Sequence, residues 1–234
     1  MKKILIIGVA LAYFTSCGKM VDSTSGTLIT ETRIAADFNE IHIQDHIDVQ
    51  YTQDTVASIS VEAGENLIDY IQTDIVNGKL IIYESSNTIA NHKLIKVTVT
   101  SDSLNNIEME GSGDFNGNNM SSTFLNISTI GSGNFNSDVW TSHINISSTG
   151  SGDVQLTGAS ETQNIELKGS GDLKARFMTS DSVTVDLIGS GDAWVHADNY
   201  LNATLTGSGD INFYGNPSTV VSSNTGSGNI ILKN

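Results

Sequence analysis

The chain has 234 residues, a formal net charge of −15 and one cysteine, Cys17. A surface this acidic repels phosphate backbones, so composition excludes nucleic acid as a partner. A single cysteine excludes an internal disulfide and a cysteine zinc cluster. The 22 glycines, together with the lack of any long run of period 3.6, predict very little helix.

The first sixteen residues have the layout of an export signal. Lys2 and Lys3 give a positive start, and the apolar run from Ile4 to Phe14 is too short to span a membrane. We therefore exclude residues 1–16 from the folded part of the chain.

The residues around the cysteine resemble the lipobox of bacterial lipoproteins, in the segment Phe14-Thr15-Ser16-Cys17-Gly18. This resemblance implies that the signal is removed before Cys17 and that Cys17 is lipidated, which would hold the protein on a membrane without spanning it. The alternative is a chance cysteine in a signal that is cut elsewhere. Loss of Lys2 and Lys3 changes the net charge from −15 to −17. We expect residues 17–26 to form a flexible polar tether.

Strand-like alternation begins near Leu28 and continues to about residue 105. Asn77-Gly78 predicts a hairpin turn, and Asn66 to Tyr70 predicts one short helical turn. The expected strands include 41–44, 47–51, 58–62, 71–76, 80–83 and 95–100. We interpret this part as wide, irregular rungs that cap the regular structure that follows.

A four-residue phrase, Gly-Ser-Gly followed by Asp or Asn, then returns seven times at intervals of 18 to 20 residues. A fixed period near nineteen is typical of a solenoid, whose repeats bury their apolar sides by stacking on one another. We expect the glycines to form tight corners between strands. They are Gly111, Gly113, Gly131, Gly133, Gly150, Gly152, Gly169, Gly171, Gly189, Gly191, Gly207, Gly209, Gly226 and Gly228.

Apolar residues alternate with period two on both sides of each phrase, which is the period of a strand. One strand therefore enters each corner and another leaves it. We predict an all-β fold, a parallel β-helix whose rungs stack about 4.8 Å apart. Because no linker interrupts the sequence, residues 27–234 are expected to form one domain.

Several short segments resemble the head GIN domain family of autotransporter adhesins. They are Phe38-Asn39-Glu40-Ile41, Asp48-Val49, Asn66-Leu67, Gly78-Lys79-Leu80 and the repeated GSGD. The resemblance covers about residues 34–230. It implies a right-handed β-helix that is exported to the cell envelope and suspected of adhesion, and it brings no catalytic residues.

The position after each corner forms an acidic column, which stacking would place about 5 Å from rung to rung. One interpretation is calcium binding, since calcium takes carboxylate oxygens in flexible geometry. The other is that each side chain bonds its own backbone at the turn and otherwise faces water. The column consists of Asp114, Asp153, Asp172, Asp192 and Asp210, with Asn134 and Asn229 at two rungs.

Nothing in the repeats indicates catalysis. The seven serines of the phrase have no histidine at a constant offset to act as a base, and we expect them to form a hydrogen-bonded ladder. Every rung offers the same aspartates, whereas catalysis needs one site unlike the others. We predict that the protein is not an enzyme.

Four aromatic side chains in the repeats are candidates for stacking on sugar rings, although they could equally cover the turns of the solenoid. They are Trp140, Trp194, Tyr200 and Tyr214. Lys174 and Arg176 form the basic pair within the repeats. His42 and His46 would lie on one face of a strand, but the five histidines show no metal-ligand spacing.

Taken together, these observations predict a non-catalytic lipoprotein of the cell envelope, held at the outer membrane, that binds glycan or matrix protein. No cofactor is expected, and calcium is the one ion considered. Two alternatives remain open: a structural or sensory envelope lipoprotein without an extracellular ligand, and a carbohydrate-active β-helix enzyme. The open edge near Asn234 also leaves room for self-association.

Overall fold

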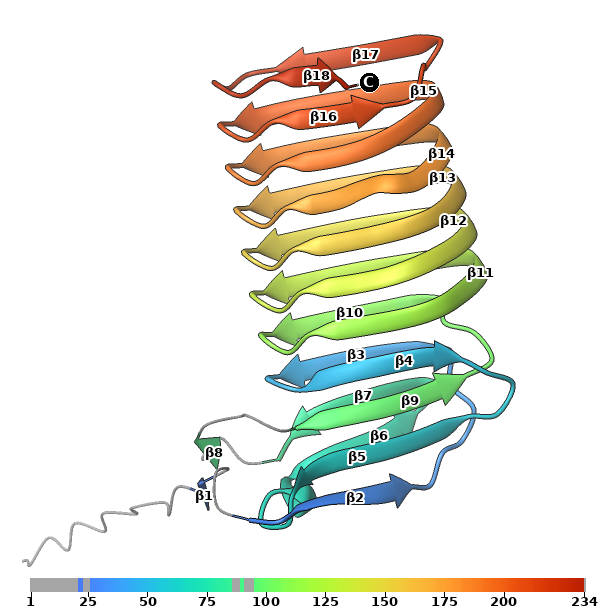
Figure 1. Cartoon of the computed structure of the whole chain (residues 1–234), viewed down its shortest axis with the longest axis vertical. Helices are drawn as coiled ribbons and strands as arrows, with labels where there is room; N and C mark the ends of the chain where they lie inside the picture. Colours follow the sequence, from blue (N-terminus) through green and yellow to red (C-terminus); the bar gives the residue numbers. More distant parts are fainter. Residues whose placement is uncertain (1–20, 23–25, 86–88, 91–94, 234) are drawn as a thin grey trace, which may run out of the picture.

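The computed structural model describes residues 21–22, 26–85, 89–90 and 95–233. Cys17 and the predicted signal lie outside the described residues. Figure 1 shows the described chain as a stack of strands that rises from β2 at one end to β17 and β18 at the other. No helix of the described residues is long and apolar enough to cross a membrane.

The C-terminal part is an all-β solenoid, as predicted. Its strands run parallel from rung to rung, and each long strand bends across both layers of the stack (Figure 1). The strands are β10 (Asn106–Gly111), β11 (Phe115–Gly131), β12 (Phe135–Gly150), β13 (Val154–Gly169), β14 (Leu173–Gly189), β15 (Ala193–Gly207), β16 (Ile211–Tyr214), β17 (Thr219–Asn224) and β18 (Ile230–Leu232). The right-handed sense of the coil stays a prediction.

Two sheets result from this pairing. The post-corner sheet contains the strand halves that follow each Gly-Ser-Gly corner, and it ends at β16 and β18. The pre-corner sheet contains the halves that lead into the next corner, and it ends at β17. Because side chains alternate along a strand, one set fills the space between the sheets and the other covers the outside.

The corner glycines stack directly on one another, with Gly169 paired to Gly150 and to Gly189. The first glycine of this phrase has φ +129, a conformation that L side chains rarely adopt, and a Cβ there would lie 2.2 Å from the carbonyl oxygen of Gly150. A Cβ on Gly171 would lie 2.1 Å from the carbonyl oxygen of Gly152. Glycine therefore allows the corners to approach to hydrogen-bonding distance.

The core between the sheets consists of stacked apolar columns. Phe115 and Phe135 lie parallel, with ring centroids 4.8 Å apart, and Tyr51 continues this stack at 6.3 Å from Phe115. Further along the same column, Leu173 and Ile211 are fully buried. Burial of these columns, at about 25 cal/mol for each Å² of apolar surface, is the main force that holds the rungs together.

One more corner of the same shape lies before the first Gly-Ser-Gly phrase, although it lacks that sequence. β3 (Glu40–Asp45) pairs in parallel with β10, and β4 (Asp48–Gln53) pairs with β11. Asp45 therefore occupies the place of the first corner glycine, opposite Gly111, and it has the positive φ of 68 that this place requires.

The end of the stack is closed by antiparallel strands, where irregular rungs were expected. The strands concerned are β2 (Leu28–Arg33), β5 (Ser58–Gly64), β6 (Ile71–Val76), β7 (Lys79–Glu84) and β9 (Lys96–Ser101). β5 pairs antiparallel with both β2 and β9, while β9 and β7 pair in parallel with β4 and β3. Antiparallel neighbours need only short connections, so they can cover the last apolar layer without another corner.

Two local predictions for this part are confirmed. β6 and β7 form a hairpin around Asn77-Gly78, which have φ values of 53 and 80. One turn of 3-10 helix, η1, covers Ile68–Tyr70. The flexible tether predicted for residues 17–26 includes a short strand, β1 (Val21–Asp22), which pairs in parallel with β8 (Ile89–Ala90).

Candidate ligand-binding site

The acidic column forms a ladder that links the rungs. Oδ1 of each Asp or Asn accepts a hydrogen bond from the backbone N–H of the column residue one rung further on, at 2.7 to 3.0 Å. The ladder begins at Asp48 and continues through Asp114, Asn134, Asp153, Asp172, Asp192 and Asp210 to Asn229. The side chains therefore bond the neighbouring rung, not their own backbone as one interpretation expected. An amide oxygen accepts this bond as well as a carboxylate does, which explains Asn134. Asn229 ends the ladder and within it only donates, to Asp210.

This ladder gives one oxygen of every column carboxylate a structural task. Among the described residues, no group of three or more His, Cys, Asp or Glu side chains is placed to hold a metal ion. Calcium binding by the column stays a prediction. The expected serine ladder is largely missing: of the phrase serines, all of which the structure describes, a hydrogen bond joins Ser208 and Ser227 alone, at 3.2 Å.

The rung of β14 departs from the regular pattern on the outer face of the post-corner sheet, as the rung of β11 does between Gly117 and Met120. The pairing of β14 with β13 is shifted between Lys174 and Phe177, and its pairing with β15 is shifted after Lys174. The extra residue makes a bulge in which Arg176 and Phe177 both face outward in succession. Bulges of this kind re-aim side chains and are common next to binding sites.

Aromatic rings hold the guanidinium of Arg176. Its Cζ atom lies 5.0 Å from the centroid of the Phe177 ring and 4.6 Å from that of Tyr214. Stacking of a cation on a ring fixes the guanidinium without using its N–H donors. Of the hydrogen bonds and ion pairs among the described residues, none involves the Arg176 side chain.

Two hollows adjoin at Arg176, Phe177 and Tyr214, and we name them together the clamp site. The first, of about 360 Å³, is also lined by Gln155, Leu156, Thr157, Lys174 and Trp194. The second, of about 350 Å³, is also lined by His196, Gly215 and Lys233. The clamp site thus combines exposed aromatic surface, with Phe177 67% exposed, and four groups that carry or can carry a positive charge.

Lys174, unlike Arg176, forms ion pairs with carboxylates of the described residues. Its Nζ lies 2.5 Å from Oδ2 of Asp153 and 3.9 Å from Oδ2 of Asp172. The bond to Asp153 raises the pKa of Lys174. Burial alone would raise the pKa of Asp153, but the hydrogen bonds from Lys174 and from the Asp172 backbone outweigh it and lower that pKa.

The structure brings together two of the four aromatic residues proposed from the sequence. Trp194 and Tyr214 line the clamp site with both members of the basic pair. Trp140 and Tyr200 line neither hollow. The sequence analysis missed Phe177 and Lys233, although the interval of twenty residues after Gly169 is a signal for the extra residue in β14.

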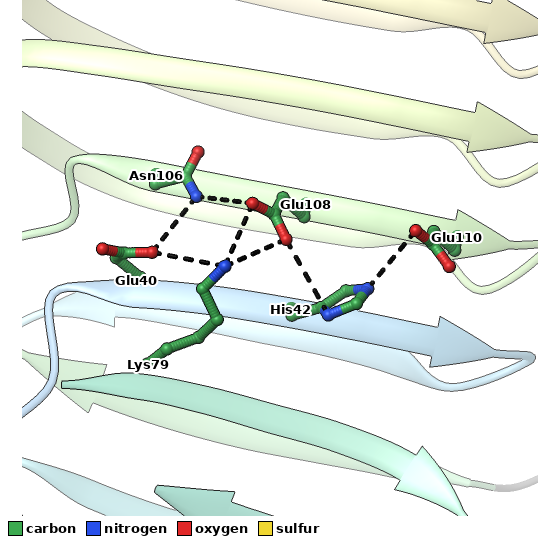
Figure 2. Close-up of polar contacts among 6 residues, drawn as sticks. All are labelled: Glu40, His42, Lys79, Asn106, Glu108 and Glu110. Carbon is green, nitrogen blue, oxygen red and sulfur yellow. Dashed lines mark hydrogen bonds and ion pairs between the residues drawn. The ribbon is translucent and has the colours of Figure 1, made fainter. Parts of the chain in front are cut away.

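A second polar group lies on the pre-corner sheet, where the antiparallel end joins the regular rungs (Figure 2). Nζ of Lys79 lies 3.1 Å from both carboxylate oxygens of Glu108 and 3.4 Å from Oε2 of Glu40. Asn106 donates to both glutamates, at 2.8 and 3.3 Å. These contacts join β7, β3 and β10, so we name the group the junction cluster.

His42 lies between two carboxylates at the edge of this cluster. Its Nδ1 is 3.8 Å from Glu108, and its Nε2 is 3.6 Å from Glu110 (Figure 2). His46, which was expected beside it, is exposed in the corner that precedes Asp48. The two histidines therefore form no common metal site in the described structure.

An asparagine row continues from the junction cluster along the outside of the pre-corner sheet. Nδ2 of Asn145 donates to Asn126, and Nδ2 of Asn164 donates to Asn145, both at 3.0 Å. A shallow hollow of about 460 Å³ follows this row and includes Glu166. No aromatic residue lines this hollow, in contrast to the clamp site.

The chain is similar to proteins of known structure over nearly its whole length. A putative adhesin of Bacteroides fragilis is 27% identical, with a TM-score of 0.86 over 91% of this chain and 100% of that one. A putative lipid binding protein of Parabacteroides distasonis is 24% identical, with a TM-score of 0.75 over 92% and 100%. A putative adhesin of Parabacteroides merdae is 21% identical, with a TM-score of 0.71 over 92% and 99%.

The last two likenesses show the fold alone. None of the curated proteins compared with the chain matches it. The family model described as "Putative auto-transporter adhesin, head GIN domain" matches residues 37–217, which is most of the chain. The chain therefore belongs to the head GIN domain family.

Proposed function

We propose that the protein is a non-catalytic adhesin of the cell envelope that binds a glycan in the clamp site. The observation that carries this proposal is the bulge in β14, which places Phe177 and Arg176 beside Trp194 and Tyr214. The family and the Bacteroides fragilis neighbour support the adhesin class.

The chemistry of the clamp site suits a sugar. Aromatic rings present flat apolar surface that packs against the C–H face of a pyranose ring, while Gln155 and Thr157 offer hydrogen bonds to hydroxyl groups. Each hollow has the volume of a small-ligand site. The rigid rungs on either side hold these groups in place before a ligand arrives, which lowers the entropic cost of binding.

The sequence supports attachment at the outer membrane through lipidated Cys17, after removal of residues 1–16. A lipid anchor at that end would leave the rod free to project its C-terminal rungs, and the clamp site lies on those rungs. Display of this kind is what an adhesin needs. Matrix proteins that carry glycans are included in the proposed ligands.

A glycan array probed with the full chain in detergent tests the proposal. We expect saturable binding to one class of glycan. Trp194→Ala should reduce it about tenfold, which is the lower part of the range of about 1 to 3 kcal/mol for a nucleobase stacked on an aromatic side chain. Trp140→Ala is the matched control, since Trp140 is 48% exposed and lines neither hollow. An array without binding, or equal loss in both variants, would contradict the proposal.

A further inference from the structure

We propose that the ligand is an anionic saccharide, one that carries a carboxylate or a sulfate, and that the guanidinium of Arg176 binds the anionic group. This inference rests on the proposed function and names the chemical class of its ligand.

Arg176 is held in place yet remains unpaired. The rings of Phe177 and Tyr214 restrict its guanidinium from two directions, at 5.0 and 4.6 Å, and no carboxylate of the described residues forms an ion pair with it. A guanidinium has five N–H donors in one plane, and its geometry matches the two oxygens of a carboxylate or sulfate. Orientation by stacking removes much of the entropic cost of such a two-point contact.

The charge around Arg176 is unusual for this molecule. The chain has 26 Asp and Glu residues against 11 Lys and Arg, yet no carboxylate lines either hollow of the clamp site. Three other hollows of the described surface each contain one or more, among them Asp37, Asp45 and Glu166. The lining of the clamp site thus carries cations and no carboxylate, on a protein whose overall charge repels anions.

The neighbouring cations divide into paired and unpaired groups. Lys174 is committed to Asp153, and Nε2 of His196 lies 3.2 Å from Oδ1 of Asp198. Lys233 forms no ion pair with any of the described residues, and it lines the second hollow with Arg176. An anionic group bound between Arg176 and Lys233 would interact with two positive charges that no carboxylate of the described residues neutralises.

The clamp site favours a saccharide over a plain anion or an acidic peptide. Trp194 and Phe177 flank Arg176 with aromatic surface, which a small inorganic anion would leave uncovered. Two hollows that meet at one cation accommodate two neighbouring sugar units with the charged substituent at their junction. An acidic peptide could also reach the cation, and it is one arm of the test.

The test is isothermal titration of the full chain in detergent with three probes. They are a galacturonic acid oligomer, the same oligomer with its carboxyl groups reduced to alcohols, and a sulfated galactan oligomer. An aspartate-rich peptide serves as the fourth titrant. We expect at least one acidic oligomer to bind about tenfold tighter than the reduced one, and its affinity to fall as salt rises from 50 to 500 mM, because salt screens charge interactions.

Arg176→Gln should reduce the ratio of the affinities for the acidic and the reduced oligomer about tenfold. Arg176→Lys should restore only part of this ratio, because an ammonium lacks the planar pair of donors. Lys168→Gln is the charge-matched control, since Lys168 pairs with Glu166 and lies in neither hollow. Thermal denaturation of each variant checks that it is folded.

Three results would overturn the inference: equal binding of acidic and reduced oligomers, equal effects of Arg176→Gln and Lys168→Gln, or tighter binding of the peptide than of any oligomer. Binding of the reduced oligomer that depends on Trp194 but not on Arg176 would overturn the anionic class and leave the proposed function standing. If no oligomer binds, both fail.

Discussion

The carboxylate of Asp172 replaces a backbone carbonyl at a place where the chain turns away from its neighbour. Its Oδ1 accepts the N–H of Asp192 at 2.9 Å, while its own N–H donates to Asp153 at 3.0 Å. Each rung repeats this exchange, so the column satisfies backbone donors that the corner would leave unpaired. The charge of the carboxylate is not needed for that task, only its oxygen.

Asp172→Asn should therefore leave stability nearly unchanged, whereas Asp172→Ala should lower the free energy of unfolding by about 1 kcal/mol, since it removes the acceptor. Chemical denaturation measures both. Asn134 shows that an amide serves as the acceptor in the column, since its Oδ1 accepts the N–H of Asp153 at 3.0 Å. A large loss in the Asn variant would mean that the negative charge itself, and with it an ion, matters at this position.

A substitution at Gly169 tests how closely the corners stack. Gly169→Ala places a Cβ 2.2 Å from the carbonyl oxygen of Gly150 and forces a side chain onto φ +129, so we expect a loss of about 3 kcal/mol or more. Ser170→Ala in the same corner is the control, and it should change stability by less than about 0.5 kcal/mol because Ser170 is exposed. Equal melting temperatures for the two variants would contradict the close stacking of the corners.

The junction cluster links strand β7 of the antiparallel end to strands β3 and β10 of the parallel rungs. Burial alone would raise the pKa of Glu108, but hydrogen bonds from Asn106 and Lys79 outweigh it and hold that pKa below its usual 4.5. The bond to Glu108 raises the pKa of Lys79 above its usual 10.5. A lowered carboxyl pKa stabilises the fold above pH 4.5 and loses this effect as the pH falls. A raised lysine pKa stabilises the fold below pH 10.5 and loses it as the pH rises.

Lys79→Met should therefore destabilise the protein by about 1 kcal/mol between pH 5 and 10, because the pair is partly exposed and screened by water. The difference from the unmodified chain should shrink below pH 4 and above pH 11. Thermal melts across this range measure it. Lys96→Met, which removes an exposed lysine of β9, is the control. A difference that does not vary with pH would show that Lys79 acts through packing alone.

Sequence patterns predicted the regular elements well and the exceptions poorly. The alternation around each glycine phrase gave the strands β10 to β16, and Asn77-Gly78 gave the hairpin. Asp45-His46-Ile47-Asp48 escaped notice because it keeps the corner without any glycine, through a positive φ at Asp45. The antiparallel end was not predictable, because alternation indicates a strand and says nothing about its partner. The bulge in β14 was signalled by one extra residue, but a count cannot say which residue turns outward.

The whole molecule is a rod of net negative charge with the clamp site on its C-terminal rungs and a predicted anchor at its N-terminal end. The separation matters for function, because the anchor and the clamp site belong to opposite parts of the chain. Trp194 and Tyr214 were predicted from the sequence as candidates for sugar stacking, whereas Arg176 was noted only as a member of the basic pair. Their meeting depends on the register of β14, β15 and β16, which no local pattern determines.

The anchor is tested by the full chain in a bacterial host that processes lipoproteins. Cys17→Ala should abolish incorporation of radiolabelled palmitate, because one residue supplies the acylation site. Met20→Ala, three residues further on, should keep the label. Labelling that persists in the Cys17 variant would contradict the predicted lipobox.

A crystal structure of the protein with an acidic oligosaccharide tests the central claim most directly. We predict that the anionic group lies within hydrogen-bonding distance of the Arg176 guanidinium and that a sugar ring packs on Trp194 or Phe177. A saccharide bound along the asparagine row of Asn126, Asn145 and Asn164, on the other sheet, would contradict the assignment of the clamp site.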